Sequence, residues 1–193
     1  MHHKKFLLII TIAFCTLATT VSFAQNAEDT TDGRFHDDLL NHLVGKWNVT
    51  SMAHGSPFTS VLDAAWVLSH QFLRIHLRSH EIIPWFHVQM EYEEFIGYNH
   101  SNKRYIIHGM SIEGDEEPFE GFCYGYRTGN EFKTVAKFGT DSLIVQRFTW
   151  EPASDSWTIK STWVIAGKEG EAFLDMKLVA VKPISNRKKS LNK

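Results

Sequence analysis

Short runs of aromatic and β-branched residues recur along most of the chain, and residues typical of turns separate one run from the next. The separating segments are residues 99–102, 114–115, 128–130, 139–141, 152–155 and 167–170. Links as short as these join antiparallel neighbours, and no helical pattern of about 10 to 15 residues lies between the runs, as a parallel sheet would require. The pattern therefore predicts an all-β domain of antiparallel strands.

The runs predict about nine strands. One is expected after Trp47, and the others at residues 66–78, 87–98, 104–110, 119–126, 131–138, 142–150, 156–165 and 172–181. In the last of these, Leu174, Met176 and Leu178 alternate with polar residues, so one face is buried and the other is solvated. Since a closed sheet has no exposed edges, we expect a single antiparallel up-and-down β-barrel, with a two-sheet sandwich as the alternative.

The first residues have the order of a secretory signal peptide. Lys4 and Lys5 precede an apolar run that extends to about Ala18, and Ala24 offers a small residue for cleavage. The run is shorter than the roughly 20 apolar residues of a membrane span, although an uncleaved anchor is the alternative. We therefore expect a periplasmic or secreted protein that is not stably inserted in the membrane after cleavage.

The predicted organisation is a signal peptide at residues 1–24, a flexible leader at 25–34, a barrel domain at 35–182 and a basic disordered tail at 183–193. Asp37 is expected to cap a short helix before the first barrel strand, and Gly45 to end it. After cleavage Cys123 is the remaining cysteine, so no internal disulfide can form, and we expect a buried structural thiol there.

The charge balance and the histidines exclude some partners. With 20 basic and 22 acidic residues, nothing indicates nucleic-acid binding. The histidines do not have the spacing of a metal site, because His76 and His80 would lie roughly 13 Å apart on an extended strand. A metal would need ligands from separate strands, such as His76, His87 and His108. No metal site and no cofactor are predicted.

The segment Leu43-Val44-Gly45-Lys46-Trp47, which follows the predicted helix, resembles the Gly-x-Trp opening of lipocalins and other calycins. Together with residues 66–73, 92–99 and 103–105, it makes the chain from about Leu40 to Val181 similar to a bacterial family known as domain of unknown function 1579. The resemblance implies a calycin-like barrel, with a short helix closing one end, and it implies no chemistry.

Two positions depart from what the resemblance implies. Members of the family tend to have a glycine pair at the tight turn where this chain has Ser69-His70. Lipocalins also place an arginine over the Gly-x-Trp tryptophan from beyond the last strand, and the nearest candidate in this chain is Lys182.

A barrel of this size can enclose one small ligand, and the chain is rich in large aromatic rings. We therefore expect a binder of a small hydrophobic or amphipathic molecule. The residues expected to line its cavity are Trp47, Trp66, Met90, Tyr92, Tyr105, Trp163 and Met176. Arg74 and Arg78 are candidate anchors for a ligand carboxylate if they point inward. If they point outward, they form an exposed charge ladder with Glu91 and Glu93.

Two other classes of function stay open. The barrel could be packed solid and recognise another envelope component through its surface. It could also be a metal-dependent or hydrolytic enzyme, although the sequence has no Gly-x-Ser-x-Gly elbow, no Cys and His signature and no phosphate-binding glycine loop. No catalytic residue is predicted, and neither the ligand nor the oligomeric state follows from the sequence.

Overall fold

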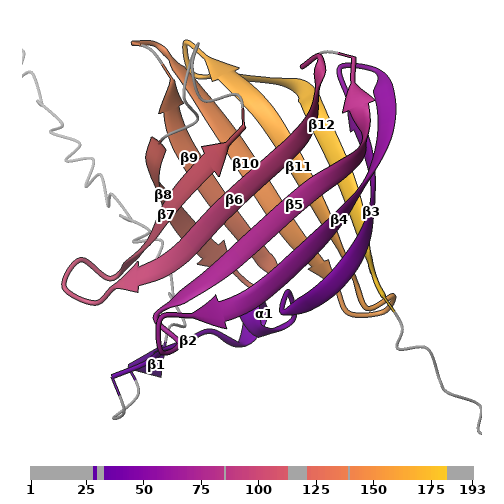
Figure 1. Cartoon of the computed structure of the whole chain (residues 1–193). Helices are drawn as coiled ribbons and strands as arrows, with labels where there is room; N and C mark the ends of the chain where they lie inside the picture. Colours follow the sequence, from indigo (N-terminus) through magenta and orange to yellow (C-terminus); the bar gives the residue numbers. More distant parts are fainter. Residues whose placement is uncertain (1–27, 30–32, 85, 113–120, 139, 182–193) are drawn as a thin grey trace, which may run out of the picture.

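The computed structural model describes residues 28–29, 33–84, 86–112, 121–138 and 140–181. The predicted signal peptide, Lys182 and the basic tail lie outside the described residues. Ten consecutive strands form one closed antiparallel barrel (Figure 1). The strands are β3 (Gly45–Ala53), β4 (Ser56–Val67), β5 (Phe72–Ile83), β6 (Val88–Asn99), β7 (Arg104–Ser111), β8 (Gly121–Thr128), β9 (Glu131–Phe138), β10 (Ser142–Glu151), β11 (Ser156–Ile165) and β12 (Lys168–Ala180).

Each barrel strand pairs with the next one in sequence, and β12 pairs with β3 to close the sheet. The predicted up-and-down barrel is therefore confirmed, and the sandwich alternative is wrong. Side chains alternate as expected: Trp47, Val49 and Ala53 of β3 are buried, while Lys46 and Asn48 are exposed. Closure is the physical reason that no strand from β3 to β12 presents a free edge.

The predicted strand boundaries are wrong in one region. The expected strand at 66–78 is in fact the end of β4 and the start of β5, and β4 itself begins as early as Ser56. A two-residue hairpin turn joins β3 to β4, with φ of 45° at His54 and 79° at Gly55. Positive φ at both central residues matches the right-handed twist of the flanking strands, so the chain can reverse there with only one glycine.

The β4–β5 turn adopts a left-handed backbone without any glycine. Leu68, Ser69 and His70 have φ of 50°, 56° and 69°, and the Gln71 amide donates to the Val67 carbonyl at 3.1 Å. His70 holds this turn against the N-terminal segment, because its Nδ1 donates to the Phe35 carbonyl at 2.8 Å. The tight turn is therefore kept where the chain has Ser69-His70 in place of glycines.

Replacing Ser69 with glycine is expected to raise the free energy of unfolding by about 0.5 to 1 kcal/mol. A left-handed φ costs a residue with a Cβ roughly 1 to 2 kcal/mol, and the greater unfolded-state entropy of glycine offsets part of the gain. Urea unfolding measures the change. The control is Ser101→Gly, an exposed turn serine outside the left-handed set, which should lower stability slightly. A loss of stability in Ser69→Gly would contradict the strain.

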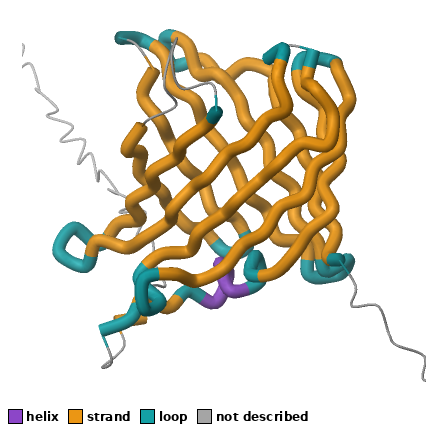
Figure 2. The backbone as a smooth tube through the Cα atoms, in the orientation of Figure 1, coloured by secondary structure: helices purple, strands orange, loops and turns teal. Residues whose placement is uncertain are grey.

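The short helix α1 (Asp38–Asn41) lies across one end of the barrel (Figures 1 and 2). We call this end the floor: α1, the residues up to Gly45 and the side chains packed on them. Asp37 caps the helix as predicted and accepts from the Leu40 amide at 2.8 Å. The helix ends at Asn41, and Gly45 begins β3 instead of ending the helix.

A small two-stranded sheet precedes the floor. It pairs β1 (Glu28–Asp29) with β2 (Phe35–His36), so part of the predicted leader is a short strand. The Phe35 ring is buried and packs edge-on against Trp66 at 5.3 Å and against Tyr105 at 5.9 Å between centroids. The segment before α1 therefore contributes to the closed end of the barrel.

Candidate functional site

The barrel encloses a cavity of about 240 Å³ between the floor and the opposite end. All ten strands from β3 to β12 contribute lining residues. Most of the wall is apolar, and its larger side chains include Phe58, Leu62, Leu77, Met90, Phe148, Phe173, Leu174 and Met176. His54 and Phe86, which lie in turns at the end opposite α1, also line the cavity. The cavity is therefore closed at the floor and extends toward that opposite end.

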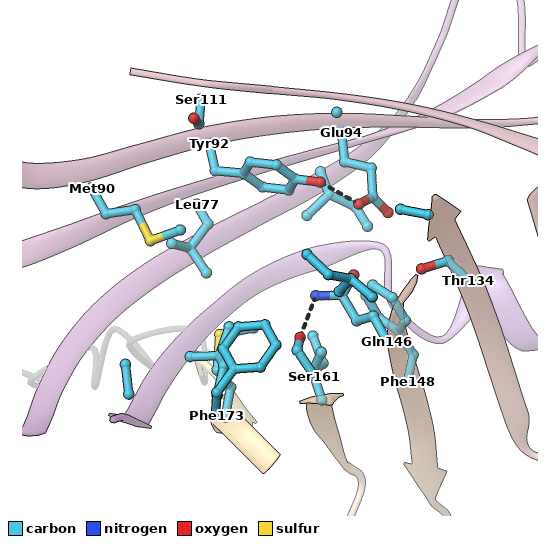
Figure 3. A pocket seen from close by; sticks show the side chains of 18 of the residues that line it. Leu77, Met90, Tyr92, Glu94, Ser111, Thr134, Gln146, Phe148, Ser161 and Phe173 are labelled. Carbon is cyan, nitrogen blue, oxygen red and sulfur yellow. Dashed lines mark hydrogen bonds between the residues drawn. The ribbon is translucent and has the colours of Figure 1, made fainter. Parts of the chain in front are cut away.

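Glu94 supplies a carboxyl group in this apolar surrounding (Figure 3). It lies on the inner face of β6, and only 2% of the residue is exposed. The Tyr92 hydroxyl donates to its Oε2 at 2.6 Å, whereas its buried Oε1 has no hydrogen-bond partner among the described residues. Burial raises the pKa of Glu94 to about 7, and the bond from Tyr92 opposes that shift.

Four other polar side chains line the cavity near Glu94 or across from it. Thr134, Gln146 and Ser161 come from β9, β10 and β11, and the Gln146 Nε2 donates to the Ser161 Oγ at 3.3 Å (Figure 3). Cys123 of β8 is the fourth, and burial raises the pKa of its thiol to about 12. Cys123 is buried, as predicted, and a thiol held in its neutral form is a poor nucleophile.

Gly109 gives Tyr92 the space that it needs to reach Glu94. A Cβ at position 109 would lie 2.4 Å from the Tyr92 hydroxyl oxygen and 3.1 Å from its ring. Because real carbon atoms do not approach that closely, any side chain at Gly109 must displace Tyr92. The pairing of Tyr92 with Glu94 therefore depends on a glycine in the neighbouring strand β7.

Gly109→Ala is expected to separate Tyr92 from Glu94 and to raise the pKa of Glu94 above its wild-type value, since the lost hydrogen bond favours the ionised form. Overpacking should also cost about 1 to 3 kcal/mol of stability. A carboxyl-carbon NMR titration measures the pKa. The control is Gly170→Ala, where a Cβ meets nothing closer than the Trp163 carbonyl at 3.6 Å. An unchanged Glu94 titration in Gly109→Ala would contradict the arrangement.

The structure brings together three of the seven residues that the sequence places in the cavity. Met90, Tyr92 and Met176 line it. Trp163 does not belong to the lining and packs against Phe173, with 5.7 Å between ring centroids.

The other three residues expected in the cavity lie in the floor. The Trp47 Nε1 donates to the Leu43 carbonyl at 2.7 Å, and the Trp66 Nε1 donates to Asn41 Oδ1 at 2.8 Å. The Tyr105 hydroxyl donates to Asp37. These side chains hold α1 in place and are not among the lining residues. They point inward as expected, but they lie at the floor, where they contact α1 and the residues next to it instead of lining the cavity.

Arg74 and Arg78 lie on the outer face of β5 and do not line the cavity. Arg74 pairs with Glu93, and Arg78 Nη2 donates to Glu91 Oε1 at 2.7 Å. The reason is alternation, because Leu73, Ile75 and Leu77 occupy the inward positions of the same strand. The structure thus corrects the role of the two arginines as ligand anchors and shows the exposed ladder instead, in which each pair contributes little to stability.

Glu94 lines the cavity but was not among the residues predicted to do so. A signal for it exists, since Met90, Tyr92, Glu94 and Ile96 follow one another at every second position of one strand. An acid in an otherwise apolar inward series is a buried polar group, which is the informative exception in a barrel interior. The adjacent Glu93, which faces outward, conceals the pattern in a run of acids.

The described residues contain no group of three His, Cys, Asp or Glu side chains that could hold a metal ion. Two of the three histidines named as candidate ligands have other contacts: the His76 Nε2 bonds Glu91 Oε1 at 2.8 Å, and His108 stacks on Phe122 at 4.5 Å. Within the same described ranges, no helix has both the length and the apolar character of a membrane span.

Comparison of the chain with family models and with curated proteins finds no match. The similarity to domain of unknown function 1579 therefore stays a prediction from the residues quoted above.

Proposed function

We propose that this protein binds one small hydrophobic or amphipathic molecule inside the barrel. The observation that supports this most is the cavity itself, which has apolar walls and one buried carboxyl group with an unsatisfied oxygen. Binding sites for small molecules have this composition, with few polar groups that orient the ligand on a largely apolar surface. A solid-cored interaction protein would not need such a space.

The volume limits the size of the ligand. An engineered apolar cavity of about 150 Å³ accommodates benzene, so about 240 Å³ suits a molecule of roughly ten non-hydrogen atoms. A larger molecule would have to extend past His54 and Phe86 at the end opposite the floor. An eight-carbon chain with a single polar end fits within this limit.

Isothermal titration calorimetry with 1-octanol tests the proposal. The wild-type protein should bind it saturably at one site. Ala136→Trp places a large ring in the cavity, because Ala136 lines it, and should weaken binding at least tenfold. The matched control is Ala65→Trp on β4, where Ala65 lies opposite the outward Arg74, and its affinity should stay within about twofold of wild type. Absence of saturable binding of octanol, octylamine and octanoate by the wild-type protein would contradict the proposal.

We also propose that the chain is exported and that cleavage after Ala24 leaves Gln25 as the first residue. Support comes from the basic start, the apolar run and the small residue at the cut. Expression of the full sequence in a bacterial host, followed by intact-mass measurement of the protein released from the periplasm, should give the mass of residues 25–193. A full-length mass in the membrane fraction would contradict cleavage.

A further inference from the structure

Glu94 has an unused hydrogen-bond acceptor inside the cavity, and it is the feature that most restricts the ligand. We propose that the polar end of the ligand donates a hydrogen bond to Glu94 Oε1. The protein then takes amphipathic alcohols or amines and discriminates against carboxylates of the same length. This inference rests on the proposed function and specifies the chemical class of the ligand.

The two oxygens of Glu94 are not equivalent. Oε2 accepts the Tyr92 hydroxyl at 2.6 Å, which fixes the orientation of the carboxyl group. Oε1 is buried, and no group in the part of the chain that the structure describes donates to it, although the side chain lines the cavity. A buried acceptor that lacks a donor is costly, and a donor brought by a ligand removes that cost. The missing donor defines what the ligand has to provide.

Glu94 also lies at the deep end of the lining. On the inner face of β6 the lining residues are Met90, Tyr92 and Glu94, whereas Ile96, the next inward residue toward the floor, is fully buried and outside the lining. A molecule whose polar end reaches Glu94 therefore has its apolar part against the cavity walls between Glu94 and the end opposite the floor. Those walls include Leu77, Phe58 and Phe173, which suit a hydrocarbon chain.

The charges of the lining residues determine which polar group of a ligand is favoured beside Glu94. The lining residues near Glu94 that can ionise are Tyr92 and Cys123, both of which are acids held neutral by burial. The lining residues that can carry a positive charge are His54, in the β3–β4 turn, and Lys137, in the second-last position of β9. A ligand carboxylate at Glu94 would thus meet another acid without a cation, whereas an ammonium or hydroxyl group would be a donor.

A matched series of eight-carbon ligands tests the head group at constant chain length. The probes are octylamine, 1-octanol and sodium octanoate, titrated calorimetrically at pH 7.5 into wild type, Glu94→Gln and Lys137→Gln. Wild type should bind octylamine and octanol and should bind octanoate at least tenfold more weakly. Glu94→Gln should weaken octylamine at least tenfold and abolish its advantage over octanoate. Lys137→Gln should keep the preference of wild type for octylamine over octanoate, because the polar end of the ligand lies at Glu94.

The results separate this inference from the proposed function. Octanoate binding as tight as octanol, and weakened in Lys137→Gln, would place the polar end beside Lys137 and overturn the role of Glu94 while leaving cavity binding intact. Equal affinity of wild type and Glu94→Gln for octylamine would overturn it as well. If no probe binds wild type, both proposals fail. The order of affinities in wild type is a sufficient test if Glu94→Gln does not fold.

Discussion

Replacement of Asp37 by alanine is expected to lower the free energy of unfolding by about 3 to 5 kcal/mol, the cost of removing one partner from a buried polar network. The Asp37 carboxylate is 1% exposed and accepts from three groups. These are the Leu40 amide at 2.8 Å, the Tyr105 hydroxyl, and Arg127 Nη1 at 3.3 Å. Alanine leaves all three donors without this acceptor, and Leu40 and Tyr105 are among the most buried residues of the core.

Asp38→Ala is the matched control. Asp38 also pairs with Arg127, through the Nη1 of that arginine. The Asp38 side chain is 79% exposed, so the expected loss in the free energy of unfolding is about 1 kcal/mol or less. Urea unfolding at pH 7 gives both values, provided that the dependence on denaturant is the same in each variant. Similar losses in Asp37→Ala and Asp38→Ala would contradict a buried network centred on Asp37.

Removing the Tyr105 hydroxyl as well as the Asp37 carboxylate tests whether the two groups stabilise the protein through their mutual hydrogen bond. Tyr105→Phe deletes the hydroxyl that Asp37 accepts, so the double variant Asp37→Ala/Tyr105→Phe leaves no unsatisfied donor at that position. The cost of the double variant should be smaller than the sum of the two single costs, because the two groups interact directly. Additive costs would show that the two side chains stabilise the floor independently.

The floor also shows how far the sequence could lead. Asp37 was predictable as a helix cap, because a cap is a local pattern of a few residues. Its bonds to Tyr105 and Arg127 join residues that are 68 and 90 positions apart, and no local pattern reports them. The arginine that reaches the floor is Arg127 of β8, whereas the resemblance to lipocalins directed attention to Lys182 beyond β12.

The sequence predicted which residues of the candidate site point inward, but not how far along the barrel axis each of them lies. Alternation identifies the inward face of a strand, so Tyr92, Trp47 and Tyr105 were all correctly placed inside. It does not give the height of a residue along the barrel axis, which depends on the tilt and stagger of all ten strands. Trp47 and Tyr105 are inward but belong to the floor, whereas Tyr92 reaches the cavity.

The missing glycines of the β4–β5 turn illustrate a second limit. Gly, Asn and Asp are the clearest sequence markers of turns with positive φ, and Leu68-Ser69-His70 contains none of them. The surrounding barrel imposes the left-handed conformation, because β4 and β5 must pair from Val67 and Phe72 onward. The pairing of β4 with β5 thus outweighs the backbone preference of the turn residues, and the predicted strand at 66–78 is wrong for that reason.

Glu94→Gln is expected to abolish a loss of stability that wild type undergoes as the pH rises from 4.5 to 7. Burial raises the pKa of Glu94 in the folded protein to about 7, against a value of 4.5 in the unfolded chain. Below pH 4.5 both states are protonated, so the carboxyl group does not weaken the fold. Between pH 4.5 and 7 the unfolded state ionises first, and wild type loses up to about 3 kcal/mol of stability. Above pH 7 both states are ionised and the loss is constant.

Glutamine has nearly the same shape and does not ionise, so Glu94→Gln should not undergo this loss. The difference in unfolding free energy between variant and wild type should therefore rise by up to about 3 kcal/mol from pH 4.5 to pH 8, and the subtraction cancels the other titrating groups. Glu91→Gln is the control on the same strand. Its exposed carboxyl bonds Arg78 and His76, which lower the pKa of Glu91, so its difference from wild type should not rise over this range. A flat difference for Glu94→Gln would mean that the carboxyl group is solvated in the folded protein, and the cavity would then lack the unsatisfied acceptor on which its ligand selectivity depends.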